Sequence, residues 1–152
     1  MRALFVALAL LLAGCGYKSI TLHLPRSDDA QHITIIQPLE PVIGSIGDEA
    51  QIKLAHDIGS YLRSKLSKRL QNYHTTIKIE RVYLYLDPHK NHNNLYGEVI
   101  VGVEIEKPGR FIQKRIAIKG VDTAKGIGYE KRIEAFLIRL LDEVAREIEE
   151  LI

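Results

Sequence analysis

The sequence lacks the features that would mark a disulfide scaffold, a membrane bundle or a nucleic-acid-binding protein. It has one cysteine, Cys15, so no disulfide can form within the chain. Its apolar run from Ala3 to Leu12 has ten residues, too few to cross a hydrocarbon core of about 30 Å. The formal net charge is only +2, without the basic excess and stacking aromatic residues of a nucleic-acid binder. We therefore expect no nucleic-acid partner.

Catalytic signatures are also missing. The sequence has no phosphate-cradling glycine loop, no G-x-S-x-G motif and no H-E-x-x-H pair. His89 and His92 stand three residues apart in a turn rich in Asp and Asn. This spacing could place two imidazoles on a metal, but it also fits a solvated turn, and no third ligand can be named. We expect no catalytic residue, no resident metal and no cofactor, and therefore no enzyme.

What is present indicates one folded domain behind an N-terminal leader. The chain has 152 residues, of which 46% are hydrophobic and 26% charged, as in a single globular domain. Arg2 and the apolar run form the first two parts of a signal peptide. The leader ends in Leu12-Ala13-Gly14-Cys15, which resembles the bacterial lipobox at all four positions.

The lipobox predicts where the chain is cut and anchored. We expect residues 1–14 to be removed as the signal peptide, and Cys15 to carry diacylglycerol and an N-acyl chain. Each buried methylene contributes about 0.8 kcal/mol, so these chains would dominate membrane attachment. The next residue is Gly16 rather than Asp, which favours the periplasmic face of the outer membrane. Residues 15–31 would be a lipid-anchored tether, and residues 32–152 a single α+β domain.

Hydrophobic periodicity predicts the element order β-α-β-β-β-α. Residues 17–24 alternate and fit either a tether or an edge strand. Asp48 fits a helix N-cap, and the apolar face of the next strand changes near Glu80, which indicates a β-bulge. We expect a mostly antiparallel four-stranded sheet with two helices packed on one face. The expected elements are a strand at 32–36, a helix at 48–72, strands at 75–86, 99–105 and 112–118, and a helix from 133 to the C-terminus.

Two kinds of side chain are candidates for contacts with other molecules. Cations could bind anionic groups such as lipopolysaccharide phosphates, or form an ordinary solvated face at a helix end. Tyr83 and Tyr85 have the strand parity of an outward face, so they could meet a protein partner or be covered by the N-terminal segment. The candidate cations are Arg63, Lys65, Lys68 and Arg69 in one cluster, and Lys114, Arg115 and Lys119 in a second.

The lipobox followed by Cys15-Gly16-Tyr17, together with the expected element order, resembles the LptE-type lipopolysaccharide-assembly lipoproteins. The resemblance implies a non-catalytic subunit that supports a large LptD-like outer-membrane β-barrel and can bind lipopolysaccharide. It transfers Cys15 as the lipid site and no binding residue. A YajG-like small outer-membrane lipoprotein of unassigned envelope role is the alternative, and a lipid-tethered periplasmic hydrolase is a third class.

Overall fold

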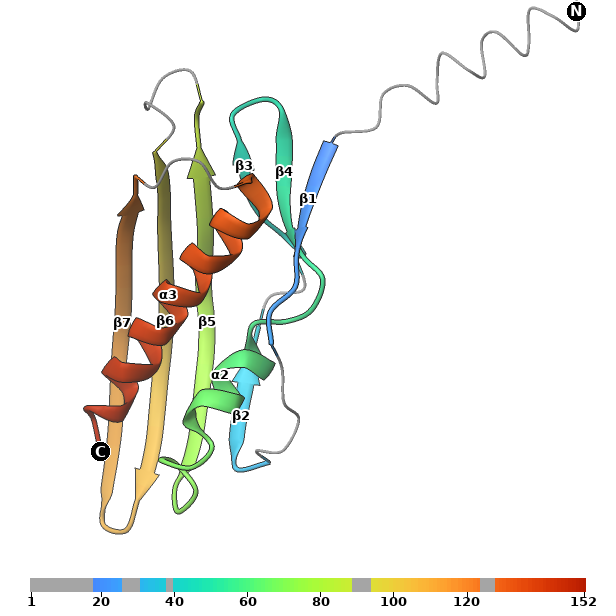
Figure 1. Ribbon diagram of the computed structural model, residues 1–152. Coiled ribbons are helices and arrows are strands. Elements are labelled where there is room, and N and C mark those ends of the chain that lie inside the picture. Colours follow the sequence, from blue (N-terminus) through green and yellow to red (C-terminus); the bar gives the residue numbers. More distant parts are fainter. Residues whose placement is uncertain (1–17, 26–30, 38–39, 89–93, 124–127) are drawn as a thin grey trace, which may run out of the picture.

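The structure is a computed structural model that describes residues 18–25, 31–37, 40–88, 94–123 and 128–152 (Figure 1). Cys15, His89 and His92 therefore lie outside the described residues. The strands are β1 Lys18–Leu22, β2 Ile33–Ile36, β3 Val42–Ile46, β4 Ala50–Leu54, β5 His74–Leu86, β6 Leu95–Lys107 and β7 Arg110–Asp122, and the helices are α2 Gly59–Leu66 and α3 Tyr129–Glu149.

All the strands belong to one mixed sheet, so the expected four-stranded, mostly antiparallel sheet is wrong. The sheet has seven strands in the order β1-β4-β3-β5-β6-β7, and β2 pairs with β5 off this path. The pairs β1–β4, β2–β5 and β3–β5 are parallel, whereas β3–β4, β5–β6 and β6–β7 are antiparallel. The sequence-based prediction missed β3 and β4 and left β1 open.

The hairpin of β3 and β4 occupies the place where a helix was expected to begin. Asp48, the predicted N-cap, lies in the hairpin turn. Gly47 has a φ of 45°, a left-handed conformation that glycine adopts without a Cβ clash. Its N–H donates to the carbonyl of Leu86 at 2.7 Å, which holds the turn beside the end of β5. Because the hairpin takes up residues 42–54, α2 begins only at Gly59 and ends at Leu66.

The C-terminal half follows the prediction. β5, β6 and β7 form an antiparallel meander. The register of β5 against β6 shifts between Ile79 and Arg81, so the expected β-bulge is present, and the buried side of β5 changes parity there. α3 is the expected amphipathic C-terminal helix. Its buried apolar residues are Ile133, Phe136, Leu137, Leu140, Leu141, Val144, Ala145 and Ile148.

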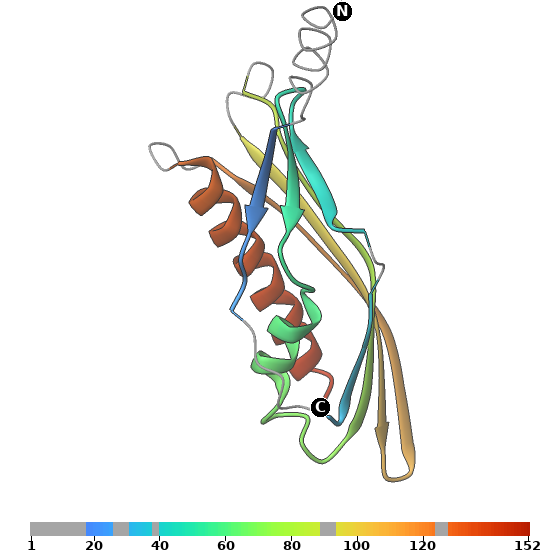
Figure 2. The ribbon, with the colours of Figure 1, turned by 90° about the vertical axis from the view of Figure 1, so that its right-hand side faces the viewer.

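Both helices cover the same face of the sheet, as expected (Figure 2). α3 contacts β6 and β7 at one edge and also β1 at the other edge. A flat sheet with strands about 4.8 Å apart could not touch a helix about 10 Å wide at both edges. The sheet therefore curves around α3 and encloses the hydrophobic core. No helix covers its other face, called the outer face below, within the described ranges.

The described part of the N-terminal segment is an edge strand. β1 pairs in parallel with β4 from Lys18 to Leu22. Leu22 is fully buried, and Leu24 is buried next to it. Of the two alternatives left open by the sequence, tether or edge strand, residues 18–22 adopt the second.

Candidate functional site

A group of apolar side chains is exposed on the outer face, near one end of the β5–β6–β7 meander. Tyr85 lies opposite Tyr96, and Tyr96 lies opposite Val121, so the three form one row across the sheet. Tyr83 is next to this row, with its ring stacked on that of Tyr85 at a centroid distance of 6.5 Å. Tyr83, Tyr96 and Val121 are 40%, 38% and 47% exposed. These four residues are called the tyrosine surface below.

The hydroxyl of one member of this surface has a partner within the chain. Tyr85 donates to Oδ2 of Asp87 at 3.1 Å. This hydrogen bond to a carboxylate raises the pKa of Tyr85 above its ordinary value. Tyr85 is therefore neutral at physiological pH, and its ring adds area rather than charge.

Charged side chains that form ion pairs border the tyrosine surface. Glu98 forms ion pairs with Arg81, at 3.2 Å, and with Lys119, also at 3.2 Å. The guanidinium of Arg81 lies 5.4 Å from the centre of the Tyr83 ring, within cation–π range. A shallow hollow of about 380 Å³ lies over β5, β6 and β7 at this surface. The surface thus combines exposed rings with cations that already have partners.

The structure places the first predicted cation cluster around α2, where most members contact other elements. Arg63 donates from Nε to the carbonyl of Ile33 at 3.1 Å. Lys65 pairs with Asp142 of α3 at 3.3 Å. Arg69 follows the helix and lies 3.8 Å from a carboxylate oxygen of Glu149. These contacts tie α2 to β2 and α3, which gives three of the four cations a structural role.

Lys68 differs from its neighbours. It is exposed and has no ion pair within the part of the chain that the structure describes.

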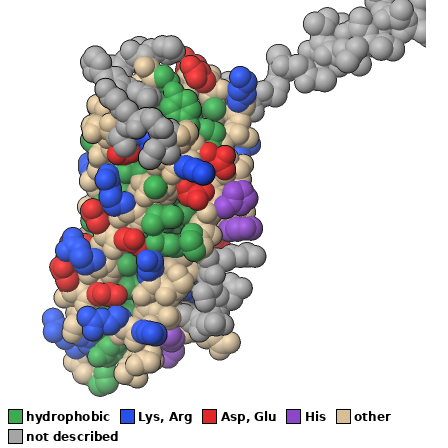
Figure 3. All heavy atoms as spheres, viewed as in Figure 1, with side chains coloured by type: hydrophobic (Ala, Val, Ile, Leu, Met, Phe, Trp, Pro, Cys, Tyr) green, Lys and Arg blue, Asp and Glu red, His purple; other side chains and the backbone are tan. Residues whose placement is uncertain are grey.

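The second predicted cation cluster is divided between the two faces of the sheet. Lys114 is on the helix side, 3.9 Å from Glu147 of α3. Arg115 and Lys119 are on the outer face, where Arg115 pairs with Glu80 at 2.7 Å. The three residues therefore do not form one patch. On the helix side, Lys and Arg side chains are interspersed with Asp and Glu (Figure 3).

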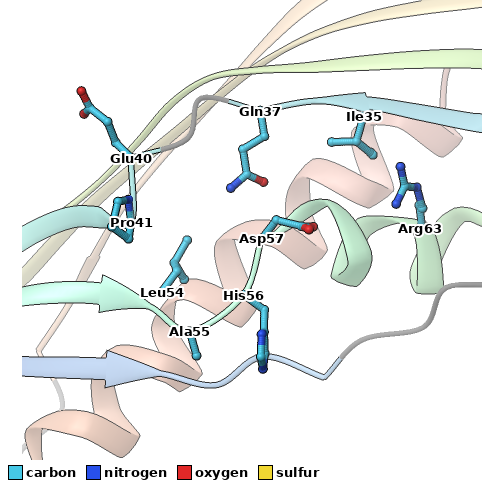
Figure 4. A pocket seen from close by; sticks show the side chains of 9 residues that line it. All are labelled: Ile35, Gln37, Glu40, Pro41, Leu54, Ala55, His56, Asp57 and Arg63. Atoms are coloured by element: carbon cyan, nitrogen blue, oxygen red, sulfur yellow. The ribbon is translucent and has the colours of Figure 1, made fainter.

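A hollow of about 400 Å³ lies between the end of β2, the segment after β4 and α2 (Figure 4). Its polar side chains mostly hold the local backbone. Asp57 accepts the backbone N–H of Ser60 at 2.8 Å and so caps the start of α2. Gln37 accepts the backbone N–H of Ile58 at 3.1 Å. Glu40 points away from the other side chains (Figure 4). The contacts of Asp57 and Gln37 thus support the chain at the start of α2.

α2 and α3 are joined by a buried tyrosine. The hydroxyl of Tyr61 donates to Oδ1 of Asp142 at 2.6 Å. Burial, together with this hydrogen bond to a carboxylate, raises the pKa of Tyr61. The interaction fixes the two helices to each other.

Metal-binding and membrane-spanning features were sought in the described residues alone. No three His, Cys, Asp or Glu side chains there lie close enough to hold a metal ion together. Neither described helix combines the length and the apolar character needed to cross a membrane.

Sequence reasoning found only half of the tyrosine surface. It gave Tyr83 and Tyr85 an outward parity, and the described strand β1, Lys18–Leu22, pairs with β4 instead of covering them. It missed Tyr96 and Val121, because both lie beyond the strand boundaries that periodicity suggested. Extending the alternation through Gly97 and Gly120 would have found them.

Comparisons with known proteins give little further information. No protein-family model matches the sequence, and no curated protein matches it. One solved structure, described only as an uncharacterized protein, is 14% identical, with a TM-score of 0.45 over 88% of this chain and 99% of that one.

Proposed function

We propose that this protein is a non-catalytic, lipid-anchored interaction module on the periplasmic face of the outer membrane. There it supports a β-barrel protein that assembles lipopolysaccharide. The observation that carries the proposal is the complete lipobox at Leu12-Ala13-Gly14-Cys15, followed by Gly16-Tyr17 as in the LptE-type lipoproteins.

The position of β1 supports a module that is held close to its membrane. The sheet begins at Lys18, three residues after Cys15. An extended chain of three residues reaches about 10 Å. An acylated Cys15 would therefore hold the domain at the bilayer surface, which is where an accessory subunit of a membrane-embedded protein has to be.

The chemistry of the described residues favours binding over turnover. Most of the charged side chains described above already have partners: Glu98 forms an ion pair with Lys119, and Asp57 accepts the backbone N–H of Ser60. The exposed rings of the tyrosine surface, by contrast, are typical of a surface that contacts another molecule. A lipid-anchored binding protein fits both features.

Co-purification tests the partner. The acylated protein is extracted in detergent from outer membranes of its own host, and the proteins that accompany it are identified by mass spectrometry. A stoichiometric lipopolysaccharide-assembly barrel is the expected result. Recovery of the protein alone, or with unrelated envelope proteins, would contradict the barrel assignment and favour a YajG-like role.

A control variant separates specific partners from proteins that bind the resin. Cys15→Ala removes the acylated thiol, so the expected precursor stays unprocessed and should not reach the outer membrane. A barrel recovered equally with this variant would be a contaminant of the preparation.

A further inference from the structure

The tyrosine surface lies at the end of the sheet from which the N-terminal segment leaves. The pairing registers connect the first residue of β1 to the ends of the meander strands in a single row. This row consists of Lys18, Ala50, Ile46, Leu86, Leu95 and Asp122. In Figure 1 it corresponds to the end of the sheet at which β1 begins and the arrows of β5 and β7 finish.

Tyr85, Tyr96 and Val121 form the next row, one residue further from that end. One strand residue advances about 3.3 Å. The three Cα–Cα steps from Cys15 to Lys18 span at most about 10 Å, so the row lies within about 14 Å of Cys15 along the strand direction. The polar headgroup layer of a bilayer leaflet is itself about 5 to 8 Å thick. An anchor at Cys15 therefore holds this end of the sheet, and with it the row of rings, near the headgroup layer.

We propose that the tyrosine surface docks into the phospholipid headgroup layer of the membrane that carries the anchor. The inference rests on the lipid anchor proposed above. Tyrosine is enriched at membrane–water interfaces because its ring is apolar and its hydroxyl is polar. The exposed edge of Val121 adds apolar area beside the rings.

The charges around the surface point to zwitterionic headgroups rather than to anionic lipid. The nearby cations Arg81 and Lys119 share the carboxylate of Glu98. Asp87 accepts the hydroxyl of Tyr85 at the same end. No unpaired basic cluster borders the rings within the described residues, so attraction to anionic lipids should contribute little.

The rest of the outer face is unsuited to lying flat on lipid. Its middle carries the Arg115–Glu80 ion pair and the hydrogen bond from Gln113 to Glu104. Immersing these groups would remove their water, which is costly. The domain should therefore touch the bilayer with one end only.

Phe111 provides a matched position at the opposite end. It lies opposite Glu106, which pairs with His74 at the start of β5, and it is 58% exposed on the same outer face. β5 has 13 residues, so the two ends are about 40 Å apart. The chain that follows α2 leads into β5 at His74. The cations around α2 would therefore also lie on the side away from the bilayer.

The sequence contains no tryptophan, so a single introduced tryptophan reports its own position. The mature chain is coupled through Cys15, its only thiol, to a maleimide phospholipid in neutral phosphatidylcholine vesicles that contain brominated lipid. We expect the emission of Tyr96→Trp to be blue-shifted and quenched several-fold more than that of Phe111→Trp. Adding 1 M NaCl should leave the quenching unchanged.

Three results would overturn the inference. Equal quenching at both positions would mean that the outer face lies flat. Absence of quenching of Tyr96→Trp would leave the surface to a protein partner. Adding Tyr83→Ser and Val121→Ser to Tyr96→Trp should lower its quenching at least twofold, and no decrease would show that the introduced tryptophan itself causes the docking.

The chemical tether keeps this test separate from the proposed function. The maleimide lipid supplies an anchor whether or not the cell acylates Cys15. Failure of docking would therefore not count against lipidation, which acyl labelling in the host measures independently.

Discussion

Replacing Gly97 with alanine should destabilise the fold, because α3 packs directly onto β6 at this glycine. A Cβ at position 97 would lie 2.6 Å from Phe136, 2.7 Å from Leu140 and 2.8 Å from Leu84. These three side chains are at most 3% exposed, so none can move into solvent. The added methyl group therefore forces α3 away from the sheet or drives core side chains out of their rotamers.

The magnitude follows from two opposing effects. Overpacking a close-packed core costs about 1 to 3 kcal/mol. Alanine recovers about 0.5 to 1 kcal/mol relative to glycine within a strand, because it restricts the unfolded chain. We therefore expect Gly97→Ala to lower the free energy of unfolding by up to about 2.5 kcal/mol. Urea unfolding measures this as a lower midpoint with an unchanged m value.

Gly102→Ala is the matched control in the same strand. A Cβ there would face the outer side, 3.4 Å from Oε1 of Glu80, a flexible side chain that can move. This variant should be neutral or stabilised by up to about 1 kcal/mol. If Gly97→Ala proves as stable as Gly102→Ala, the close packing of α3 on β6 is refuted.

Three further predictions concern the helices and the outer face. Tyr61→Phe should cost about 1.5 to 3 kcal/mol at neutral pH, because it removes the 2.6 Å hydrogen bond to Asp142. Because the pKa of Tyr61 is raised in the folded protein, its contribution to stability is complete below the unfolded pKa of about 10 and is lost as the pH rises above that value. Above a pH of about 10 the free energy of unfolding of the parent protein should therefore fall more steeply than that of Tyr61→Phe. Parallel pH profiles for the two proteins would contradict this. Asp57→Ala should cost about 1 kcal/mol in urea unfolding, because the N–H of Ser60 loses its cap, whereas Asp57→Asn should restore most of it. Arg115→Gln should change stability by less than about 1 kcal/mol in the same assay, because its ion pair on the outer face is largely exposed, and a larger loss would show that the pair is more strongly coupled.

The early part of the chain shows why short segments resist prediction. Ile52 and Leu54 are buried in β4 while Gln51 and Lys53 are more exposed, which is strand alternation. Ile52 also begins an apolar series that continues into α2, so the same residues fit a helical stripe. Periodicity over so few residues cannot separate the two. The pairing of β4 with β1 and β3 decides the matter, and no local pattern shows it.

Long elements were predicted more reliably because their patterns repeat. The 13 residues of β5 reveal both the alternation and its break at the bulge, and the 21 residues of α3 define one apolar stripe. The ends of β6 and β7 were missed because Gly97 and Gly120 interrupt the apolar alternation. Both glycines lie beneath Phe136 and Leu140 of α3, so they belong to the strands for packing reasons that the sequence does not reveal. For the same reason Tyr96 and Val121 were not recognised as surface partners of Tyr83.

Acylation of Cys15 is the premise on which both the proposed function and the membrane orientation depend. Intact mass spectrometry of the protein purified from its own host membranes measures it most directly. We predict a chain that begins at Cys15 and carries a diacylglycerol thioether together with an N-acyl chain. A chain that begins at Met1, or one cut elsewhere with a free thiol at Cys15, would contradict the account.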